Sequence, residues 1–452
     1  MSPPNSSIRR LALVAVTFVL LATACSHPQP TAGLFSSTSA TTAPKAASTG
    51  TPGTLGDLKD LCGDGGGKVP RSTARGVTDD EIQIGVVNDA TNTVLPGLGQ
   101  QYVDVAKAFA SWCNEAGGIN GRKLKIVSRD GQMTNQPANI LDACESDFML
   151  VGGSTPFDAQ TVAPRKSCDL ASIDLYPSAD TIDSPLHATI SRSVQDQVNV
   201  AGYRLLQGRY GDALQRLGVT QIDIASNVDD TDTIVGALEE AGYAKVVSYQ
   251  KVPPVVDSQR TYIQPLVGKA DAVYPAVLGP SIYWQGFKDV GYEPRVVIDA
   301  IGNFDTWSTS RAMADAPPAM PVYSTSDGYP YDRISDNPTL EAIQAMNPPV
   351  DGETRMDVSA ERIWATWILF ARAAGTCTDE LTPKCVIDNA AKETSFDAGG
   401  IMAPVDVSDP RKMSACRTIV RVDEKGLHYE EGLTKPTEGP FNCDPKNVLP
   451  AG

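Results

Sequence analysis

From residue 81 onward, short apolar segments alternate with longer segments whose apolar residues recur at helical spacing. Residues 81–87 alternate and then become fully apolar, as expected of a buried strand, and residues 100–115 have the helical spacing. Residues 124–127, 138–145 and 148–151 continue the order with a strand, a helix and a strand. Strands that alternate with helices predict an α/β fold, with helices on both faces of a parallel sheet.

The same alternation restarts near residue 195. Helices are expected at residues 195–208, 231–241, 262–267, 281–290 and 359–374, and strands at 221–225, 245–248, 272–274 and 295–298. The chain from residue 55 onward exceeds the ~250–300 residues at which single cores stop growing. We therefore expect two α/β domains, with the proline- and cysteine-rich C-terminal part completing the first.

The first 25 residues have the features of a bacterial export signal. Arg9 and Arg10 precede an apolar run over residues 11–21, and small residues then lead to Cys25. The run is shorter than the ~20 residues that a membrane span needs. Small residues that end on a cysteine resemble a lipobox, in which the cysteine is lipidated, although Ala22 stands where leucine is commonest. The alternative is an ordinary secretory signal.

The segment after Cys25 has the composition of a flexible tether. Residues 26–54 are almost entirely Ser, Thr, Ala, Pro and Gly, which bury too little apolar surface to offset the entropy of ordering. No later stretch is long and apolar enough for a transmembrane helix. We therefore expect a protein held by lipid at the extracytoplasmic face of a bacterial cell membrane.

Composition argues against several classes of function. The chain has 38 basic and 54 acidic residues, a formal net charge of −16, which disfavours nucleic acid as a ligand. It has only three histidines, and it lacks a G-x-S-x-G motif, a phosphate-binding loop and a complete dinucleotide loop. We expect no enzymatic activity, no cofactor and no bound metal.

Eight cysteines remain after Cys25. An even number in an exported protein indicates disulfides, although eight cysteines can pair in many ways. Cys377 and Cys385 flank a proline-bearing turn, and Cys416 and Cys443 share a C-terminal β-like region. For the remaining four cysteines we favour the pairs Cys62–Cys113 and Cys144–Cys168. A zinc site is the alternative, disfavoured because no C-x-x-C pair occurs.

Two blocks of sequence have a recognisable pattern: GVTDDEIQIG at residues 76–85 and NEAGGINGRKL at residues 114–124. They resemble the opening strand and the first helix-to-strand turn of the type I periplasmic binding proteins, the branched-chain amino-acid-binding family of ABC importers. The second block is interpreted as structural, because Gly117 and Gly118 can take positive φ where a helix reverses into a strand.

The resemblance implies a two-lobed type I fold, in which two Rossmann-like parallel-sheet domains are joined by hinge strands. The implied segments are a signal peptide (1–25), a tether and lead-in (26–75), lobe 1 (76–190), lobe 2 (191–322), and a return to lobe 1 with a cysteine-rich elaboration (323–452). It also implies a monomer that captures a small polar solute for an ABC permease in the membrane. The alternatives are a ligand-sensing receptor of the same fold and, disfavoured by the scarcity of histidine, a cell-envelope hydrolase.

Residues that follow the strands are the candidates for solute contacts, because ligands of open α/β sheets bind beyond the carboxyl ends of the strands. Ser154 and Thr155 follow the third strand, where the family uses serine and threonine, and their hydroxyls are expected beside free helix amides that suit a carboxylate. The alternative is a plain helix N-cap. Further candidates are Asn88, Thr91, Asp174, Tyr176, Tyr274 and Asn303.

Asp229 and Asp230 are the acidic candidates, expected where a strand of lobe 2 ends. The resemblance implies that an aspartate here holds an ammonium group of the solute. The alternative is that both residues cap the helix expected at residue 231. The family's D-x-x-Y-G pattern is replaced by Asp230-Thr-Asp-Thr-Ile, which leaves the usual aromatic contact unassigned.

Overall fold

The computed structural model describes most of the chain. The described residues are 51–93, 96–191, 196–276, 280–298, 320–347, 349–350, 353–354 and 358–451. Cys25, the tether up to residue 50 and Asn303 lie outside these ranges. Within them, no helix combines the length and the apolar character that a bilayer crossing demands.

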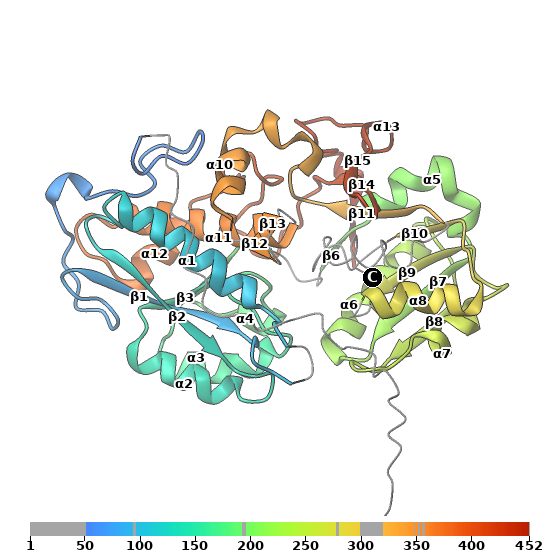
Figure 1. The fold of residues 1–452 in the computed structure, drawn as a ribbon, viewed down its shortest axis with the longest axis horizontal. Coiled ribbons are helices and arrows are strands. Elements are labelled where there is room, and N and C mark those ends of the chain that lie inside the picture. Colours follow the sequence, from blue (N-terminus) through green and yellow to red (C-terminus); the bar gives the residue numbers. More distant parts are fainter. Residues whose placement is uncertain are drawn as a thin grey trace, which may run out of the picture. The chain divides into compact units, whose positions relative to one another are not determined.

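Lobe 1 is built on a parallel sheet with the strand order β2-β1-β3-β4-β5 (Figure 1). Its strands are β1 (Glu81–Asn88), β2 (Lys123–Asp130), β3 (Met149–Val151), β4 (Ser172–Asp174) and β5 (His187–Thr189). Ile82, Ile84 and Val86 belong to the core on one face of the sheet, and Val87 belongs to the core on the other. Such a strand, buried on both faces, explains the apolar run in the sequence.

Helices cover both faces of this sheet. They are α1 (Gln100–Glu115), α2 (Gln136–Ser146), α3 (Val162–Ser167), α4 (Ala179–Ile182), α10 (Pro338–Met346), α11 (Val358–Gly375) and α12 (Pro383–Ala390). α1 and α11 pack over one face, and α2 covers the other (Figure 1). Every residue of α11 from 363 to 371 is at most 1% exposed. α11 is therefore a buried helix of the kind that is apolar on all sides.

Lobe 2 is built on a sheet with the order β15-β14-β11-β10-β9-β7-β8. Its strands are β7 (Leu217–Ile222), β8 (Val246–Val252), β9 (Ala272–Ala276), β10 (Val296–Ile298), β11 (Val322–Ser326), β14 (Thr418–Asp423) and β15 (Gly426–Tyr429). β7 to β11 are parallel, and β14 and β15 extend the sheet antiparallel. The α/β fold expected from the sequence is thus confirmed.

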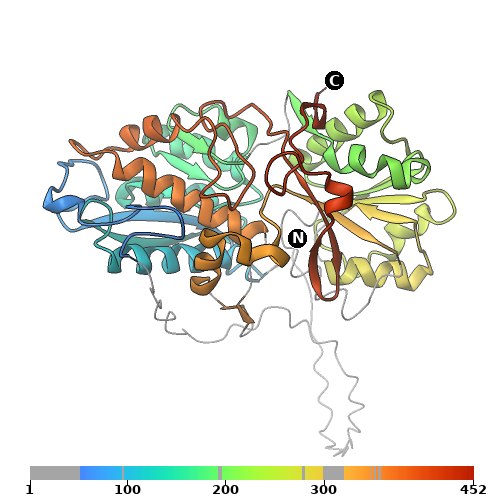
Figure 2. The same cartoon turned by 90° about the horizontal axis from the view of Figure 1, so that it is seen from above.

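The faces of the second sheet are also covered by helices. They are α5 (Ala201–Leu214), α6 (Ala225–Glu240), α7 (Arg260–Ile263), α8 (Pro280–Val290) and α13 (Glu431–Thr434). α5 and α6 form one core with the sheet, and α7 and α8 form a second core with it (Figure 2). Two small antiparallel pairs complete the fold, β6 (Gln197–Asn199) with β16 (Val448–Pro450) and β12 (Pro349–Val350) with β13 (Glu353–Thr354).

Two predicted elements of lobe 2 are wrong. Residues 195–208 were expected to form one helix, but the strand β6 precedes α5, because Val198 pairs with Leu449 of β16. The strand expected at 221–225 is β7, which begins at Leu217 and ends at Ile222. β7 starts and ends earlier in the chain than predicted because its residues pair with both β8 and β9. α6 then begins at Ala225.

The sequence predicts that residues 323–452 return to lobe 1. The structure shows that only part of this segment does so. α10, α11 and α12 do pack in the core of lobe 1. β14, however, pairs with β11 from Val322↔Val422 to Ser326↔Thr418 and therefore belongs to the sheet of lobe 2. Ile419 of β14 packs in one core of lobe 2, and Val420 and Val422 pack in the other.

The four disulfides in the structure are the pairs that the sequence favours. They are Cys62–Cys113, Cys144–Cys168, Cys377–Cys385 and Cys416–Cys443. None of these cysteines is therefore a free thiolate. The one group of metal-ligand types within the described residues, Cys416, Glu438 and Cys443, is thus already used by a disulfide.

The lead-in, residues 51–75, packs onto lobe 1. Leu55 and Leu61 are buried in the core of lobe 1, and Cys62 is bonded to Cys113 of α1. The backbone of Gly63 donates to the carbonyl of Gly118 at 2.7 Å. Gly117 and Gly118 have φ of 116° and 85°, so the predicted turn needs glycine at both positions.

Candidate functional site

The loops after β3 and β4 meet at the carboxyl edge of the lobe 1 sheet. A side chain at Gly153 would place its first carbon 2.3 Å from the backbone nitrogen of Val87, so this loop needs glycine to lie against β1. The Ser154 amide donates to the Val87 carbonyl at 3.1 Å, and the Leu175 amide donates to the Gly153 carbonyl at 3.2 Å. Ser154 Oγ also donates to the backbone carbonyl of Tyr176 at 3.4 Å. The predicted residues Ser154 and Tyr176 are therefore neighbours.

An arginine and an aspartate from distant segments adjoin Tyr176. Arg362 of α11 donates from Nη1 to the Tyr176 hydroxyl at 3.4 Å, and its guanidinium carbon lies 5.6 Å from the ring centroid. Nε and Nη2 of Arg362 both donate to Oδ1 of Asp327, at 3.0 and 2.6 Å. Burial favours the neutral carboxyl, but the charges of Arg362 and Arg417 hold the pKa of Asp327 below its usual range. The cluster is therefore an ionised, buried pair beside Tyr176.

Sequence reasoning misses Arg362 and Asp327. Neither follows a strand of the five-stranded sheet, and both lie far along the chain from Tyr176. The available signals are that Asp327 directly follows β11 and that Arg362 immediately precedes the apolar run at residues 363–371. A charged residue next to such a run is costly to bury unless it is paired.

Thr155 is buried against Asp89 rather than beside helix amides. Its Oγ1 donates to Oδ2 of Asp89 at 2.7 Å. Oδ1 of Asp89 accepts from the Met133 amide and from Nε2 of Gln136, at 2.5 and 2.8 Å. Helical structure begins at Asp158, with a 3₁₀ turn that runs into α3, so the predicted helix start lies three residues after Thr155. Thr155 thus links the ends of β1 and β3.

Asn88 and Thr91 bond to the end of β2. Asn88 is fully buried, and its Nδ2 donates to Ser128 Oγ at 2.8 Å. The Thr91 amide donates to Oδ2 of Asp130 at 2.9 Å, and its Oγ1 accepts from Gln132 at 3.0 Å. Both residues tie neighbouring strand ends together, and the exposed Thr91 is the more accessible of the two.

Asp174 lies in a buried ionic network inside lobe 1. Arg165 pairs with Asp174 at 2.6 Å and with Asp158 at 3.2 Å, and Nδ1 of His187 lies 3.2 Å from Asp174. Burial alone would raise the pKa of Asp174, but Arg165 and His187 lower it well below its usual range. Ser172 Oγ also donates to Asp174. These bonds occupy the carboxylate, so the structure gives Asp174 a structural role.

In lobe 2, the acidic candidates lie on a helix and not at a strand end. Asp229 and Asp230 are within α6, so the predictions that they close a strand or cap a helix at residue 231 are wrong. Burial, and secondarily the charge of Asp229, raises the pKa of Asp230 from 3.8 to about 6. Tyr274, on β9, packs edge-on against Tyr203 at 6.2 Å. The hydroxyl of Tyr203 is buried, and that burial raises its pKa.

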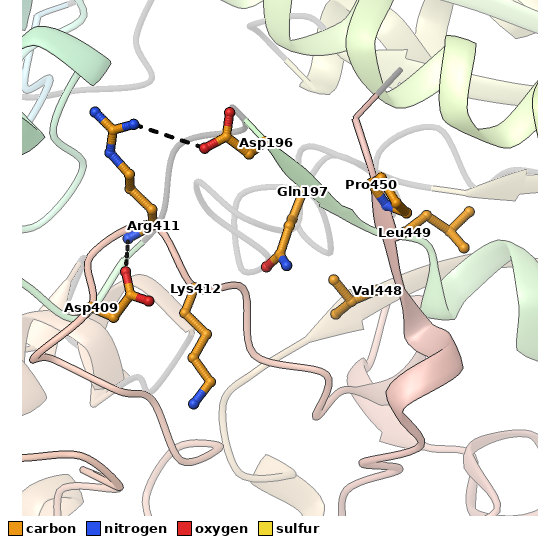
Figure 3. A pocket seen from close by; sticks show the side chains of 8 residues that line it. All are labelled: Asp196, Gln197, Asp409, Arg411, Lys412, Val448, Leu449 and Pro450. Carbon is orange, nitrogen blue, oxygen red and sulfur yellow. Dashed lines mark hydrogen bonds and ion pairs between the residues drawn. The ribbon is translucent and has the colours of Figure 1, made fainter.

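Two surface pockets in the described residues lie away from these strand ends. One, of about 330 Å³, is lined by residues 196–197, 409, 411–412 and 448–450 (Figure 3). The other, of about 810 Å³, lies between residues 59–66 of the lead-in and the C-terminal end of α11. Neither pocket includes Ser154, Tyr176 or Asp230.

A protein-family model described as "Periplasmic binding protein" matches residues 81–427 of this chain. A search of curated proteins finds no match.

Solved structures share the fold at low identity. A fatty acid ABC transporter substrate-binding protein from Thermomonospora curvata has a TM-score of 0.61 and 16% identity, over 82% of this chain and 97% of its own. A branched-chain amino acid transporter substrate binding protein from Streptococcus pneumoniae, in complex with isoleucine, has a TM-score of 0.59 and 14% identity. The match covers 78% of this chain and 99% of that protein. A solute binding protein of an ABC transporter from Rhodopseudomonas palustris, in complex with 3,4-dihydroxy benzoic acid, has a TM-score of 0.58 and 15% identity. The match covers 78% of this chain and 96% of that protein.

Proposed function

Because this chain belongs to the periplasmic binding protein family, we propose that it captures a small polar solute, an amino acid or a related compound, for an ABC importer. Members of this family are solute-binding proteins that work outside the cytoplasm. The finer proposal includes a lipid anchor at Cys25 and a permease that receives the loaded protein. Capture is a binding event, in which the solute favours a closed conformation over an open one.

The observation that carries the proposal is the group of donors at the carboxyl edge of the lobe 1 sheet. The Ser154 hydroxyl lies there and donates to the Tyr176 carbonyl, and Arg362 donates to the Tyr176 hydroxyl. An arginine has only donors, so the Tyr176 oxygen accepts the hydrogen bond from Arg362. A donor-rich group of this kind is suited to a carboxylate oxygen. Isoleucine and 3,4-dihydroxy benzoic acid, named with two of the relatives, are both carboxylic acids.

Asp230 is our candidate for an ammonium group of the solute. It is the sixth residue of α6, the helix after β7, and is half-buried, with its pKa raised to about 6. A carboxylate that is costly to ionise in the free protein gains most from an arriving cation. Ser154 and Tyr176 in one lobe and Asp230 in the other would then recognise the two ends of a zwitterion.

Tyr176→Phe is expected to weaken binding of a carboxylate solute about tenfold, close to 1.4 kcal/mol, because the solute oxygen loses a donor in a desolvated site. A thermal-shift screen with isoleucine, leucine and 3,4-dihydroxybenzoate identifies the ligand to use, and calorimetry then measures its affinity. Tyr292→Phe is the matched control, because its hydroxyl bonds to the Ala270 carbonyl inside lobe 2. Equal affinity in Tyr176→Phe and the parent protein would remove Tyr176 from the site.

Cys25→Ala is expected to release the protein from the membrane fraction into the medium or soluble extract, because the lipid-bearing sulfur is lost. Fractionation followed by immunoblotting measures the distribution. Ser26→Ala is the control, since it changes the neighbouring residue and keeps the cysteine. Membrane retention of Cys25→Ala at the parent's level would contradict lipid anchoring at this residue.

A further inference from the structure

One strand connects the two lobes in the forward direction of the chain. The chain leaves the lobe 1 sheet after β5, forms β6, and enters lobe 2 at α5. The family match ends at residue 427, so residues 428–451 are a described segment beyond it. That segment supplies β16, which is the strand partner of β6.

The C-terminal segment pairs with the whole length of β6. Leu449 lies opposite Val198 in the antiparallel pair. The Val200 amide donates to the Asn447 carbonyl at 2.7 Å, and the Ala451 amide donates to the Asp196 carbonyl at 2.8 Å. Backbone bonds thus extend beyond both ends of β6.

Side chains of β6 are held by a second segment, which returns from lobe 1 toward β14. The Met413 amide donates to Oε1 of Gln197 at 3.0 Å. Nδ2 of Asn199 donates to the Ser414 carbonyl at 2.9 Å. Both bonds come from polar residues that flank the buried Val198. β6 is therefore bonded by one segment through its backbone and by another through its side chains.

The two segments are joined to each other covalently and by hydrogen bonds. Cys416 forms a disulfide with Cys443, across a sequence separation of 27. Arg417 and Asn442 exchange two backbone hydrogen bonds, at 3.0 and 2.9 Å. Asn447 is fully buried, and its Nδ2 donates to the Ala415 carbonyl at 2.8 Å. The result is a closed ring of contacts around β6.

The surface pocket shown in Figure 3 lies within this ring. Arg411 points toward Asp196 in that view, with a closest nitrogen–oxygen distance of 3.9 Å, and it pairs with Asp183 of lobe 1 at 2.5 Å. The side chains in these ion pairs are half or more exposed. Exposed pairs contribute little, so the disulfide, the backbone bonds and Asn447 carry the restraint.

We propose that residues 442–451, closed onto residues 413–417 by Cys416–Cys443, form a clamp that fixes the conformation of β6 and limits the relative motion of the lobes. Movements of hinged domains require changes in φ and ψ at a few connecting residues. Backbone bonds on β6 oppose such changes in this chain. The clamp is a property of the connection and does not depend on which solute the protein binds.

The test compares two disulfide-free variants by hydrogen–deuterium exchange without solute. Cys416→Ser with Cys443→Ser is expected to accelerate exchange of the amides at residues 197–200, 448, 449 and 451 at least about tenfold. Cys144→Ser with Cys168→Ser is the matched control, because its sequence separation is 24 and the bridge lies in lobe 1. The two variants lose a similar restraint on the unfolded chain. Equal exchange at residues 197–200 in the two variants would overturn the clamp.

Asn447→Ala provides a second route that leaves all four disulfides in place. It removes the Nδ2 bond to Ala415 and the Oδ1 bond that accepts from Arg204. We expect faster exchange at residues 197–200 and a broader distribution of radii in small-angle X-ray scattering. Parent-like exchange and scattering in Asn447→Ala would count against the proposal even if the cysteine variant does not fold. Neither readout requires a solute. A negative result would therefore overturn the clamp without affecting the proposed binding function, and a failed binding experiment would leave the clamp untouched.

Discussion

Arg165→Met is expected to lower the free energy of unfolding by about 3–5 kcal/mol. Arg165 is 5% exposed and lies between the carboxylates of Asp158 and Asp174, at 3.2 and 2.6 Å. Methionine approximates the length of the arginine stem and removes its charge. The carboxylates of Asp158 and Asp174 then lose the cation that they share. Both residues are at most 5% exposed, so water cannot replace that cation.

Urea unfolding at pH 7 measures the Arg165→Met loss, with Arg295→Met as its matched control. Arg295 pairs with Asp212 at 3.3 Å, but the two side chains are 50% and 87% exposed. The control is expected to lose less than about 1 kcal/mol, because exposed pairs are screened by water. Adding Asp158→Asn and Asp174→Asn to Arg165→Met is expected to recover part of the loss. Similar losses in Arg165→Met and Arg295→Met would show that the network contributes little.

The Arg165 network also positions the candidate site. Oδ2 of Asp158 accepts from the Ser178 amide at 2.8 Å and from Thr181 Oγ1 at 2.6 Å. Asp158 follows β3, and Ser178 follows β4, so the network joins the two loops that carry Ser154 and Tyr176. We expect Arg165→Met to weaken solute binding as well, through displacement of these loops.

Asp230→Asn is expected to stabilise the free protein above pH 6, by up to about 3 kcal/mol. The pKa of Asp230 is raised from 3.8 to about 6 in the folded protein. Between these two values the folded state binds more protons than the unfolded state, so stability falls as the pH rises through that window. The penalty is absent below pH 3.8 and complete above pH 6. Asparagine carries no charge to desolvate and so removes the penalty.

Thermal or urea unfolding of Asp230→Asn and its parent at pH 4.5 and pH 8 tests this. The difference in stability between them should grow from the lower pH to the higher. Asp223→Asn is the control, because Asp223 is exposed next to the end of β7. If Asp230 also binds the solute's ammonium group, the stabilised variant loses affinity for an amino acid. A pH-independent difference would contradict a buried, protonated Asp230.

The parts of the fold that sequence reasoning predicts are those set by local pattern. The apolar run before Asn88 predicts β1, and the two glycines at residues 117–118 predict the turn into β2. The proximity of Ser154 and Tyr176 is predictable because the carboxyl ends of parallel strands meet at one edge of the sheet. Each of these inferences needs only a few neighbouring residues.

The missed features all depend on contacts between segments distant in sequence. β6 looks helical locally, but pairing with residues 448–450 makes it a strand. β14 joins lobe 2 because Thr418 meets Ser326 of β11. Arg362 reaches Tyr176 only after the chain has passed through lobe 2 and returned. Local propensity carries no information about such pairings, which tertiary structure decides.

The disulfide between the lead-in and α1 determines where a force applied at the N-terminus acts on the fold. Cys62 is bonded to Cys113 in the last turn of α1, and Leu55 and Leu61 are buried in the same core. Tension along residues before the lead-in therefore enters the molecule through a covalent bond to α1 and stops there. Lobe 2 and the connecting strand carry none of that load. A pull from this end would therefore leave the connection between the lobes, with its disulfide Cys416–Cys443, as it is in the unloaded protein.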